Sequence, residues 1–367
     1  MHAVVIGAGI AGLATAALLG REGYEVTVVD SLDEVGGRAG SFAEDGFRWD
    51  TGPSWYLMPE AFDHFFALCG TSTEAELDLV DLSPAYRVFH GDAPVDVHSG
   101  IEEVTALFES LEPGAGDKVR QYLAQASDTY DMALEHFLYT TFSAPLNLVH
   151  RDIRTRISRL IALLTVNLKQ YVGRTFSDAR LRQILSYPAV FLSSEPAAAP
   201  ALYSLMSHTD LVEGVRYPQG GFAAVVQAVY RQAKKFGATF RLGEEVTSIK
   251  VSNRQVTGVR TNKGAIHADI VVSAADLHHT ETQLLPPQLR TYPERYWARR
   301  NPGLGTVVVL AGVKGKLPEL AHHTFLFSQD WDPDFRAVFS APETERPLGA
   351  SESIYISKVS ATDADVA

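Results

Sequence analysis

The fold is decided near the N-terminus by the stretch Ala3-Val4-Val5-Ile6-Gly7-Ala8-Gly9-Ile10-Ala11-Gly12. A short apolar strand pattern runs into a glycine-rich turn, and an Ala- and Leu-rich helical pattern follows as far as Arg21. Gly23 ends that pattern, and residues 24–29 read as a second strand that stops at Asp30. Strand, glycine-rich turn, helix, strand and acid follow one another with the spacing of a dinucleotide-binding unit. The sequence therefore predicts an α/β chain with a Rossmann-like domain.

Each glycine of this unit, and the acid that follows it, has a physical role. Gly7 permits the tight turn, Gly9 lets the backbone approach a pyrophosphate at the helix N-terminus, and Gly12 lets the helix pack closely on the strand. Asp30 is expected to accept hydrogen bonds from an adenosine ribose. A structural glycine turn is the alternative for an isolated GxGxxG pattern, but the second strand and the acid favour dinucleotide binding.

A second glycine-rich loop, Gly36-Gly37-Arg38-Ala39-Gly40-Ser41, comes just after the acid, and Phe47-Arg48-Trp49-Asp50-Thr51-Gly52-Pro53-Ser54 follows it. A plain NAD site does not need such a loop, whereas FAD extends further, from adenine to a buried isoalloxazine ring. We expect Gly36 and Gly37 to approach the ribityl and phosphate region and Arg38 to add a cation. A glycine-rich hairpin turn with a solvated arginine is the alternative.

Through these motifs the chain resembles the carotenoid desaturases of the phytoene desaturase type, in their bacterial all-in-one form, within the amine-oxidase-like flavoprotein superfamily. Other segments carry the resemblance further along the chain: Leu-Glu-Pro-Gly-Ala-Gly at 111–116, Tyr-Pro-Gln-Gly-Gly at 217–221, Val-Val-Ser-Ala-Ala-Asp at 271–276 and Leu-Pro-Glu-Leu-Ala-His-His at 317–323. The resemblance implies FAD as cofactor and an apolar polyene such as phytoene as substrate. It also implies further cofactor contacts, which we expect from Gly52, Pro53, Ser54, Trp55, Gly220, Gly221 and the backbone of Val246.

The resemblance also implies a domain plan. An FAD-binding domain of residues 1–86 and 217–276 is expected beside a discontinuous α+β substrate domain of residues 87–216 and 277–367, with 101–210 largely helical. Residues 266–273 and 306–313 each read as one strand. Members of the resembled family continue beyond the position of Ala367 with a glycine-rich segment that completes the flavin site. We therefore expect a fragment in which an open trough lies beside Gly36, Gly37, Pro53 and Gly220.

Bulk properties exclude some classes of function. The 367 residues carry a net charge of −12, which disfavours nucleic-acid binding. A single cysteine, Cys69, excludes an internal disulfide and suits a reducing cytoplasm, and its apolar neighbours predict a core thiol. The pair His322-His323 does not favour a metal site, because adjacent side chains point to opposite sides of most elements and no ligand spacing lies nearby.

The segment 147–171 predicts a basic amphipathic helix. One face carries apolar residues at helical spacing, namely Ile153, Ile157, Leu160, Ile161, Leu164 and Leu168. Residues 147–174 contain six basic residues and one acid, Asp152. A core-facing helix with a solvated basic face is one interpretation, and a helix on an anionic bilayer surface is the other. The lipid-soluble substrate implied by the resemblance favours the bilayer and a cytoplasmic, peripheral membrane location.

The resemblance implies a reaction. FAD-dependent desaturation transfers a hydride from the substrate to flavin N5 and then removes a proton from the next carbon. The cofactor, and not a side chain, accepts the hydride. No residue in the sequence stands out as a catalytic base. Because no second dinucleotide fingerprint occurs, a quinone or oxygen is expected to accept the electrons. The alternatives are a carotenoid isomerase or ketolase, an amine or protoporphyrinogen oxidase, and an inactive flavin-free fragment.

Overall fold

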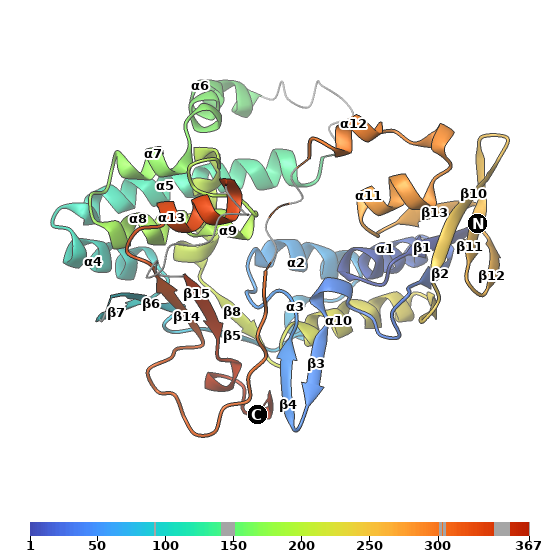
Figure 1. Ribbon diagram of the computed structural model, residues 1–367, viewed down its shortest axis with the longest axis horizontal. Coiled ribbons are helices and arrows are strands. Elements are labelled where there is room, and N and C mark those ends of the chain that lie inside the picture. Colours follow the sequence, from blue (N-terminus) through green and yellow to red (C-terminus); the bar gives the residue numbers. More distant parts are fainter. Residues whose placement is uncertain (92, 141–150, 301–302, 304–305, 341–352, 367) are drawn as a thin grey trace.

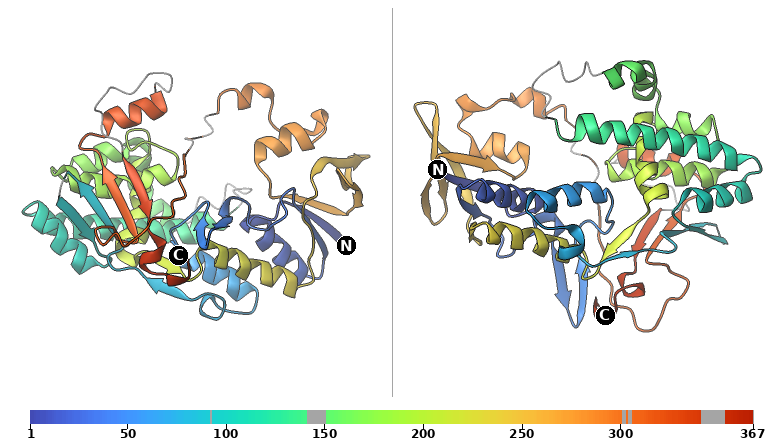
Figure 2. Two further views of the ribbon diagram at one scale, coloured as in Figure 1. Left: turned by 60° about the horizontal axis from the view of Figure 1, so that its bottom comes forward. Right: turned by 180° about the vertical axis from the view of Figure 1, so that it is seen from behind.

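The computed structural model describes the chain except for residues 92, 141–150, 301–302, 304–305, 341–352 and 367 (Figure 1). Two units lie side by side along the long axis. One is built on a parallel sheet near the N-terminus, and the other combines a group of helices with a mixed sheet (Figures 1 and 2). Residues from distant parts of the sequence contribute to each unit.

The first unit contains the predicted strand–turn–helix–strand sequence, which the structure confirms to within one residue at each end. Its parallel sheet has the order β13-β1-β2-β9. Helix α10 lies beside α1 on one face (Figure 1). The elements are β1 (His2–Ile6), α1 (Ile10–Arg21), β2 (Glu25–Val29), α10 (Phe222–Lys235), β9 (Thr239–Arg241) and β13 (Ile270–Ser273).

The two faces of β1 bury different partners because side chains alternate along a strand. Val5 packs in one cluster with the apolar residues of α1 and α10. Val4 and Ile6 point the other way, into a cluster with an antiparallel three-stranded sheet. That sheet consists of β10 (Val246–Ser252), β11 (Gln255–Thr261) and β12 (Gly264–His267). The N-terminal strand is therefore covered on both sides, as a parallel sheet requires.

The prediction of one strand over 266–273 is wrong, because the chain turns between β12 and β13. At that turn Asp269 donates its N–H to the carbonyl of His2 and accepts the N–H of His2 with its carboxylate, both at 2.8 Å. The predicted boundary at residue 276 also falls inside packed structure. Leu284 is buried with Val4, so the residues just after 276 pack on the first unit. The elements there are α11 (Leu277–His279), η6 (Thr280–Leu284), η7 (Pro287–Leu289) and α12 (Glu294–Trp297).

The second unit places helices against the mixed sheet β15-β14-β6-β7. The strands are β6 (Tyr86–His90), β7 (Ala93–Val97), β14 (His323–Phe327) and β15 (Ile354–Ser357). The helices and short helical turns are α4 (Ile101–Leu111), α5 (Ala115–Ala133), η2 (Leu134–Leu138), α6 (Arg151–Thr165), α7 (Leu168–Gly173), α8 (Ala179–Ser186), α9 (Pro188–Phe191), η4 (Ala201–Leu205), η5 (His208–Glu213), α13 (Asp332–Phe335) and η8 (Arg336–Ser340). Aromatic side chains of strands and helices share one core here.

Shorter elements join the units. Helix α2 packs on the first unit through Phe66, and Cys69, directly after the helix, is buried in the same cluster, so the predicted core position of the cysteine is confirmed. Strands β5 and β8 pair antiparallel, and so do β3 and β4. The bounds are η1 (Gly37–Ala39), β3 (Ser41–Glu44), β4 (Phe47–Asp50), α2 (Pro59–Leu68), α3 (Thr73–Glu76), β5 (Leu79–Asp81), β8 (Arg216–Pro218), η9 (Val359–Ala361) and η10 (Ala364–Val366).

Two further predictions of secondary structure are wrong. The predicted helix 147–171 is broken after Thr165, where the side chain of Asn167 accepts the N–H of Gln170 at 2.8 Å and starts α7. Its residues 147–150 lie outside the described part. Residues 306–313 form no strand, and Val307 and Val309 are 91% and 80% exposed. A strand needs a partner for its backbone groups, and no described strand pairs with this run.

Candidate functional site

The turn after β1 is built around two glycines at which any side chain would be strained. Gly7 has a φ of +102°, and its N–H donates to the carbonyl of Val29 at 2.8 Å. Gly12 lies in the first turn of α1, where a Cβ would come closer than 3.0 Å to the carbonyl oxygen of Gly7. Turn and helix therefore meet backbone to backbone, as the sequence predicts.

The N-terminus of α1 has free hydrogen-bond donors. No side chain caps it among the described residues, and its first turn holds no acidic residue. A Cβ at Gly9 would meet only the Gly36 carbonyl oxygen, at 3.8 Å, so space remains in front of the helix. Free N–H groups and the helix dipole make such an end a site for an anion. The pyrophosphate of FAD fits this cradle.

The second glycine-rich loop packs directly against the first. The N–H of Gly36 donates to the carbonyl of Ala8 at 2.9 Å, and Gly9 and Gly36 form a parallel β-bridge. A Cβ at Gly37 would lie 3.3 Å from the Cα of Gly9. The backbones of Arg38 and Gly52 are also in close contact. Fold contacts thus bring the predicted residues of both loops together, with Gly37, Arg38, Gly52 and Pro53 exposed.

Asp30 ends β2 beside the same turn. Its carboxylate accepts the N–H of Ala8 at 2.6 Å and the N–H of Leu32 at 2.9 Å. These bonds fix the carboxylate, and each oxygen keeps the capacity to accept another donor such as a ribose hydroxyl. The carbonyl of Asp30 accepts the N–H of Glu244 at 2.9 Å, which holds the start of β10 and Val246 nearby. Contact of Val246 with adenine stays a prediction.

The turn at Gly220 and Gly221 has different contacts from those of the first loop. The carboxylate of Asp50 accepts the N–H groups of Phe222 at 2.9 Å and Ala223 at 3.3 Å, and so caps α10. Burial raises the pKa of Asp50, and the two N–H bonds oppose that rise. Asp363 accepts the N–H of Gly220 at 3.0 Å. The contacts of this turn are therefore with two carboxylates, and its approach to a flavin stays a prediction.

Ser54 and Trp55 meet a hydroxyl from the second unit. The indole Nε1 of Trp55 donates to Tyr355 Oη at 2.9 Å, and Ser54 Oγ lies 2.8 Å from the same oxygen. Tyr355 Oη is also 2.7 Å from Nδ1 of His323, whose ring stacks on Trp55 at 4.4 Å. Burial lowers the pKa of His323 well below its usual range, so its ring is neutral.

Sequence reasoning missed the acids Asp50 and Asp363 and the hydroxyl of Tyr355. Asp50 stands inside a segment that the sequence singled out, but its partners lie some 170 positions away. Tyr355 lies 300 positions from Trp55 in the sequence, and no local sequence pattern predicts such a contact. Within the described residues, no group of three or more His, Cys, Asp or Glu side chains is placed to hold a metal ion.

The comparisons with known proteins agree with this geometry. The family model "Flavin containing amine oxidoreductase" matches residues 10–355. A carotenoid 3,4-desaturase of Haloarcula japonica is 36% identical, over 92% of this chain and 68% of its own length. A phytoene dehydrogenase of Streptomyces griseus is 35% identical, over 100% of this chain and 70% of its own length.

Solved structures show the same fold at lower identity. An oxidoreductase from Methanosarcina mazei superposes with a TM-score of 0.53 at 21% identity, covering 77% of this chain and 61% of the other. The fold likeness and the family match extend over both units, and the relatives share more than a third of the aligned residues. The chain therefore belongs to the flavin-containing amine oxidoreductase family and is an FAD-dependent oxidoreductase.

Proposed function

We propose that this chain carries out the FAD-dependent desaturation of a carotenoid precursor such as phytoene. The observation that carries the proposal is the N-terminus of α1, which no described side chain caps and which lies beside the Gly36–Gly37 loop. The names of the relatives, carotenoid 3,4-desaturase and phytoene dehydrogenase, support the substrate class. When bound, FAD accepts a hydride while the substrate also loses a proton, and a double bond results.

The chain's own residues would bind the cofactor, orient the substrate and shield the reacting carbons from water. The N–H groups of α1 would hold the pyrophosphate, and Asp30 would accept from the ribose. Trp55 lies three residues beyond Gly52 and packs on the buried rings of Tyr86, Tyr187 and Phe325. The exposed rings of Phe191 and Tyr355 beside it would offer an aromatic surface to an apolar chain. Such a surface would also keep water away from the reacting carbons. A quinone or oxygen would reoxidise the flavin.

The experiment is conversion of phytoene in lipid vesicles by the FAD-loaded protein, with a quinone under nitrogen or with air. New conjugated double bonds, detected as longer-wavelength absorption of the separated products, are expected only when FAD is present. Geometric isomers without a new double bond would instead indicate an isomerase, and turnover of amines alone would indicate an amine oxidase. Either result contradicts the proposal.

Helix α6 is proposed as a docking surface for an anionic bilayer. Ile157, Ile161 and Leu164 lie on one face at helical spacing and are 49%, 55% and 55% exposed. Leu160 and Leu163 face the protein and are buried. The predicted single apolar face is thus wrong in detail, because the helix has a buried side and a separate exposed apolar stripe. Within the described part of the chain, no helix is long and apolar enough to cross a membrane.

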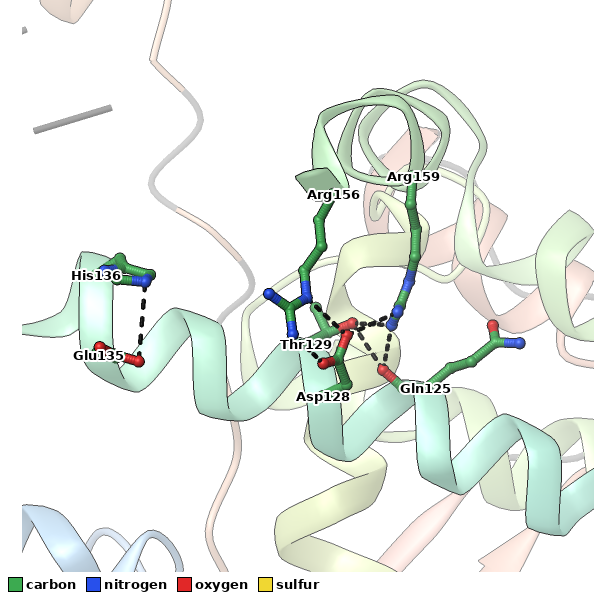
Figure 3. A network of polar contacts seen from close by, with 7 residues as sticks. All are labelled: Gln125, Asp128, Thr129, Glu135, His136, Arg156 and Arg159. Carbon is green, nitrogen blue, oxygen red and sulfur yellow. Dashed lines mark hydrogen bonds and ion pairs between the residues drawn. The ribbon is translucent and has the colours of Figure 1, made fainter. Parts of the chain in front are cut away.

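Two arginines of α6, Arg156 and Arg159, hold the helix on α5 (Figure 3). Arg156 and Arg159 each pair with the carboxylate of Asp128 at 2.8 Å, and Arg159 also donates to Thr129 Oγ1 and the carbonyl of Gln125. Hydrogen bonds from Arg156 lower the pKa of Asp128 against the opposing effect of burial. The two basic side chains therefore orient the exposed stripe, and replacing them would test the packing of α6 and not its contact with lipid.

Replacing Ile161 and Leu164 together with Asp is expected to weaken binding to anionic vesicles by about tenfold or more. Each half-exposed side chain would bury enough apolar surface to contribute about 1 kcal/mol, and the new charges would be repelled by the headgroups. The measurement is cosedimentation with vesicles of phosphatidylserine and phosphatidylcholine. Leu277→Asp, at an exposed leucine on the other unit, is the matched control. Equal sedimentation of the double variant and the control would exclude this surface.

A further inference from the structure

One face of the strand pair β14 and β15 carries three rings that pack on Trp55. His323 and Phe325 lie two residues apart on β14, and Phe325 is directly opposite Tyr355 in the register of the pair. Side chains two residues apart on a strand, and those directly opposite across a pair, share a face of the sheet. The centroids of all three rings lie within 6.3 Å of that of Trp55. Because Trp55 follows the second glycine-rich loop, this packing joins the loop to the sheet of the second unit.

Two contacts of different kinds fix the orientation of the Trp55 indole. The ring of His323 stacks on the indole at 4.4 Å with 18° between the two planes. Stacking restrains the tilt of the indole plane but leaves the indole free to turn within that plane. The hydrogen bond from the indole Nε1 to Tyr355 Oη, at 2.9 Å, is directional and prevents this turn. Residues of two neighbouring strands therefore hold the indole in both respects.

The hydroxyl of Tyr355 uses its full hydrogen-bonding capacity on its neighbours. A hydroxyl oxygen can donate one hydrogen bond and accept two, whereas the indole of Trp55 can only donate. Ser54 Oγ at 2.8 Å and His323 Nδ1 at 2.7 Å fill the two remaining places, one as donor and the other as acceptor. Both tautomers of a neutral His323 allow this arrangement, because its Nε2 has no partner among the described residues. The hydroxyl is therefore placed to orient the side chains around it.

We propose that Tyr355 and His323 are positioning residues that hold the Trp55 indole as a fixed wall for the substrate. The inference rests on the proposed desaturation of an apolar polyene. Such a substrate has no polar group by which a protein can hold it, so its place beside the flavin depends on the shape and rigidity of the walls around it. A shift of the reacting carbons by about 1 Å can lower a rate by about 100-fold.

Tyr355→Phe is expected to lower kcat for phytoene about tenfold and to leave KM within about twofold of the wild type. The variant keeps the ring, and with it the apolar surface, but removes the hydrogen bond that orients Trp55. The assay is desaturation in lipid vesicles by the FAD-loaded protein, with flavin content and melting temperature measured on the same samples. Tyr230→Phe, at a half-buried tyrosine that packs on Phe240 in the first unit, is the matched control with wild-type kcat and KM.

The indole N–H of Trp55 tests the positioning without any substrate. Its signal in ¹⁵N NMR of the FAD-loaded chain is identified by its absence from Trp55→Phe. We expect slow exchange of this proton with solvent in the wild type and in Tyr230→Phe. Exchange in Tyr355→Phe is expected to be about tenfold faster, because the net contribution of one hydrogen bond changes an equilibrium by up to about that factor.

Equal indole exchange in the wild type and Tyr355→Phe would overturn the positioning role, and so would an unchanged kcat. A raised KM with unchanged kcat would also overturn it, because the hydroxyl would then contribute to binding and not to orientation. If Tyr355→Phe does not fold, the wild type decides, since exchange as fast as in free tryptophan would show that nothing holds the indole. A wild type that does not desaturate phytoene would remove the proposed function and the substrate wall with it, whereas indole exchange would still decide whether Tyr355 holds Trp55.

Discussion

Replacing Gly9 with Val is expected to leave the chain folded and to remove its ability to retain FAD. Gly9 has an ordinary φ of −72°, and the nearest heavy atom to an added Cβ is 3.8 Å away. The protein alone therefore has room for an added Cβ in front of the helix. That room is the space through which a phosphate would reach the N–H groups of α1. The loss of two charge-assisted hydrogen bonds, at about 1.5–3 kcal/mol each, would weaken binding about 100-fold or more.

The measurement is the flavin absorbance per protein after gel filtration, together with the melting temperature of the flavin-free variant. Ala124→Val, at an exposed position on α5, is the matched control and should retain flavin as the wild type does. Full flavin stoichiometry in Gly9→Val would place the pyrophosphate somewhere else. A variant that does not fold would contradict the claim that the space in front of α1 is free.

Replacing Gly12 with Ala is expected to destabilise the fold itself, in contrast to the replacement of Gly9 with Val. An added Cβ would overlap the carbonyl oxygen of Gly7, and it would also approach the Cβ of Ala274 to 3.3 Å. Overpacking against side chains costs about 1–3 kcal/mol, and here the obstacle is backbone in a tight turn, so about 3 kcal/mol or more is expected. Urea unfolding of the flavin-free protein measures the loss.

Gly23→Ala is the comparison for this second prediction. Its φ of +85° is unfavourable for alanine, but no atom lies within 4 Å of the added Cβ. The expected loss there is about 1 kcal/mol. A Gly12→Ala variant no less stable than Gly23→Ala would show that α1 can shift away from the turn at little cost.

Local sequence patterns were sufficient to predict the structure wherever it depends on residues that are close together in the sequence. The run from Ala3 to Asp30 predicted β1, α1 and β2 because the glycines, the helical spacing and the β-branched residues all agree over short distances. The second loop at Gly36 was also predicted to lie at the site. Its contact with Gly9 follows from the same βαβ geometry, since both loops leave the same end of the parallel sheet.

Distant partners explain the errors. The sequence predicted a strand at 306–313 from its apolar run, but a run becomes a strand only where another strand meets its backbone. Contact of Gly221 with the flavin stays a prediction, and the structure adds that Asp50, a residue far away in the sequence, accepts two N–H groups at that helix N-terminus. The break at Asn167 could have been read from the sequence, because asparagine is a strong N-cap residue. Apolar periodicity on both sides of it hid the signal.

The exposed valines at 307–309 have a consequence for the behaviour of the chain in solution. Val307, Val308 and Val309 present apolar side chains to water, and their backbone pairs with no described strand. This combination is the template on which a second molecule can add a strand, and natural proteins usually guard it with charge or proline. Concentrated samples are therefore expected to self-associate through this segment, with a growing β-sheet signal and no change in the two packed units. Solubility would then be governed by a few valines and not by the chain's net charge of −12.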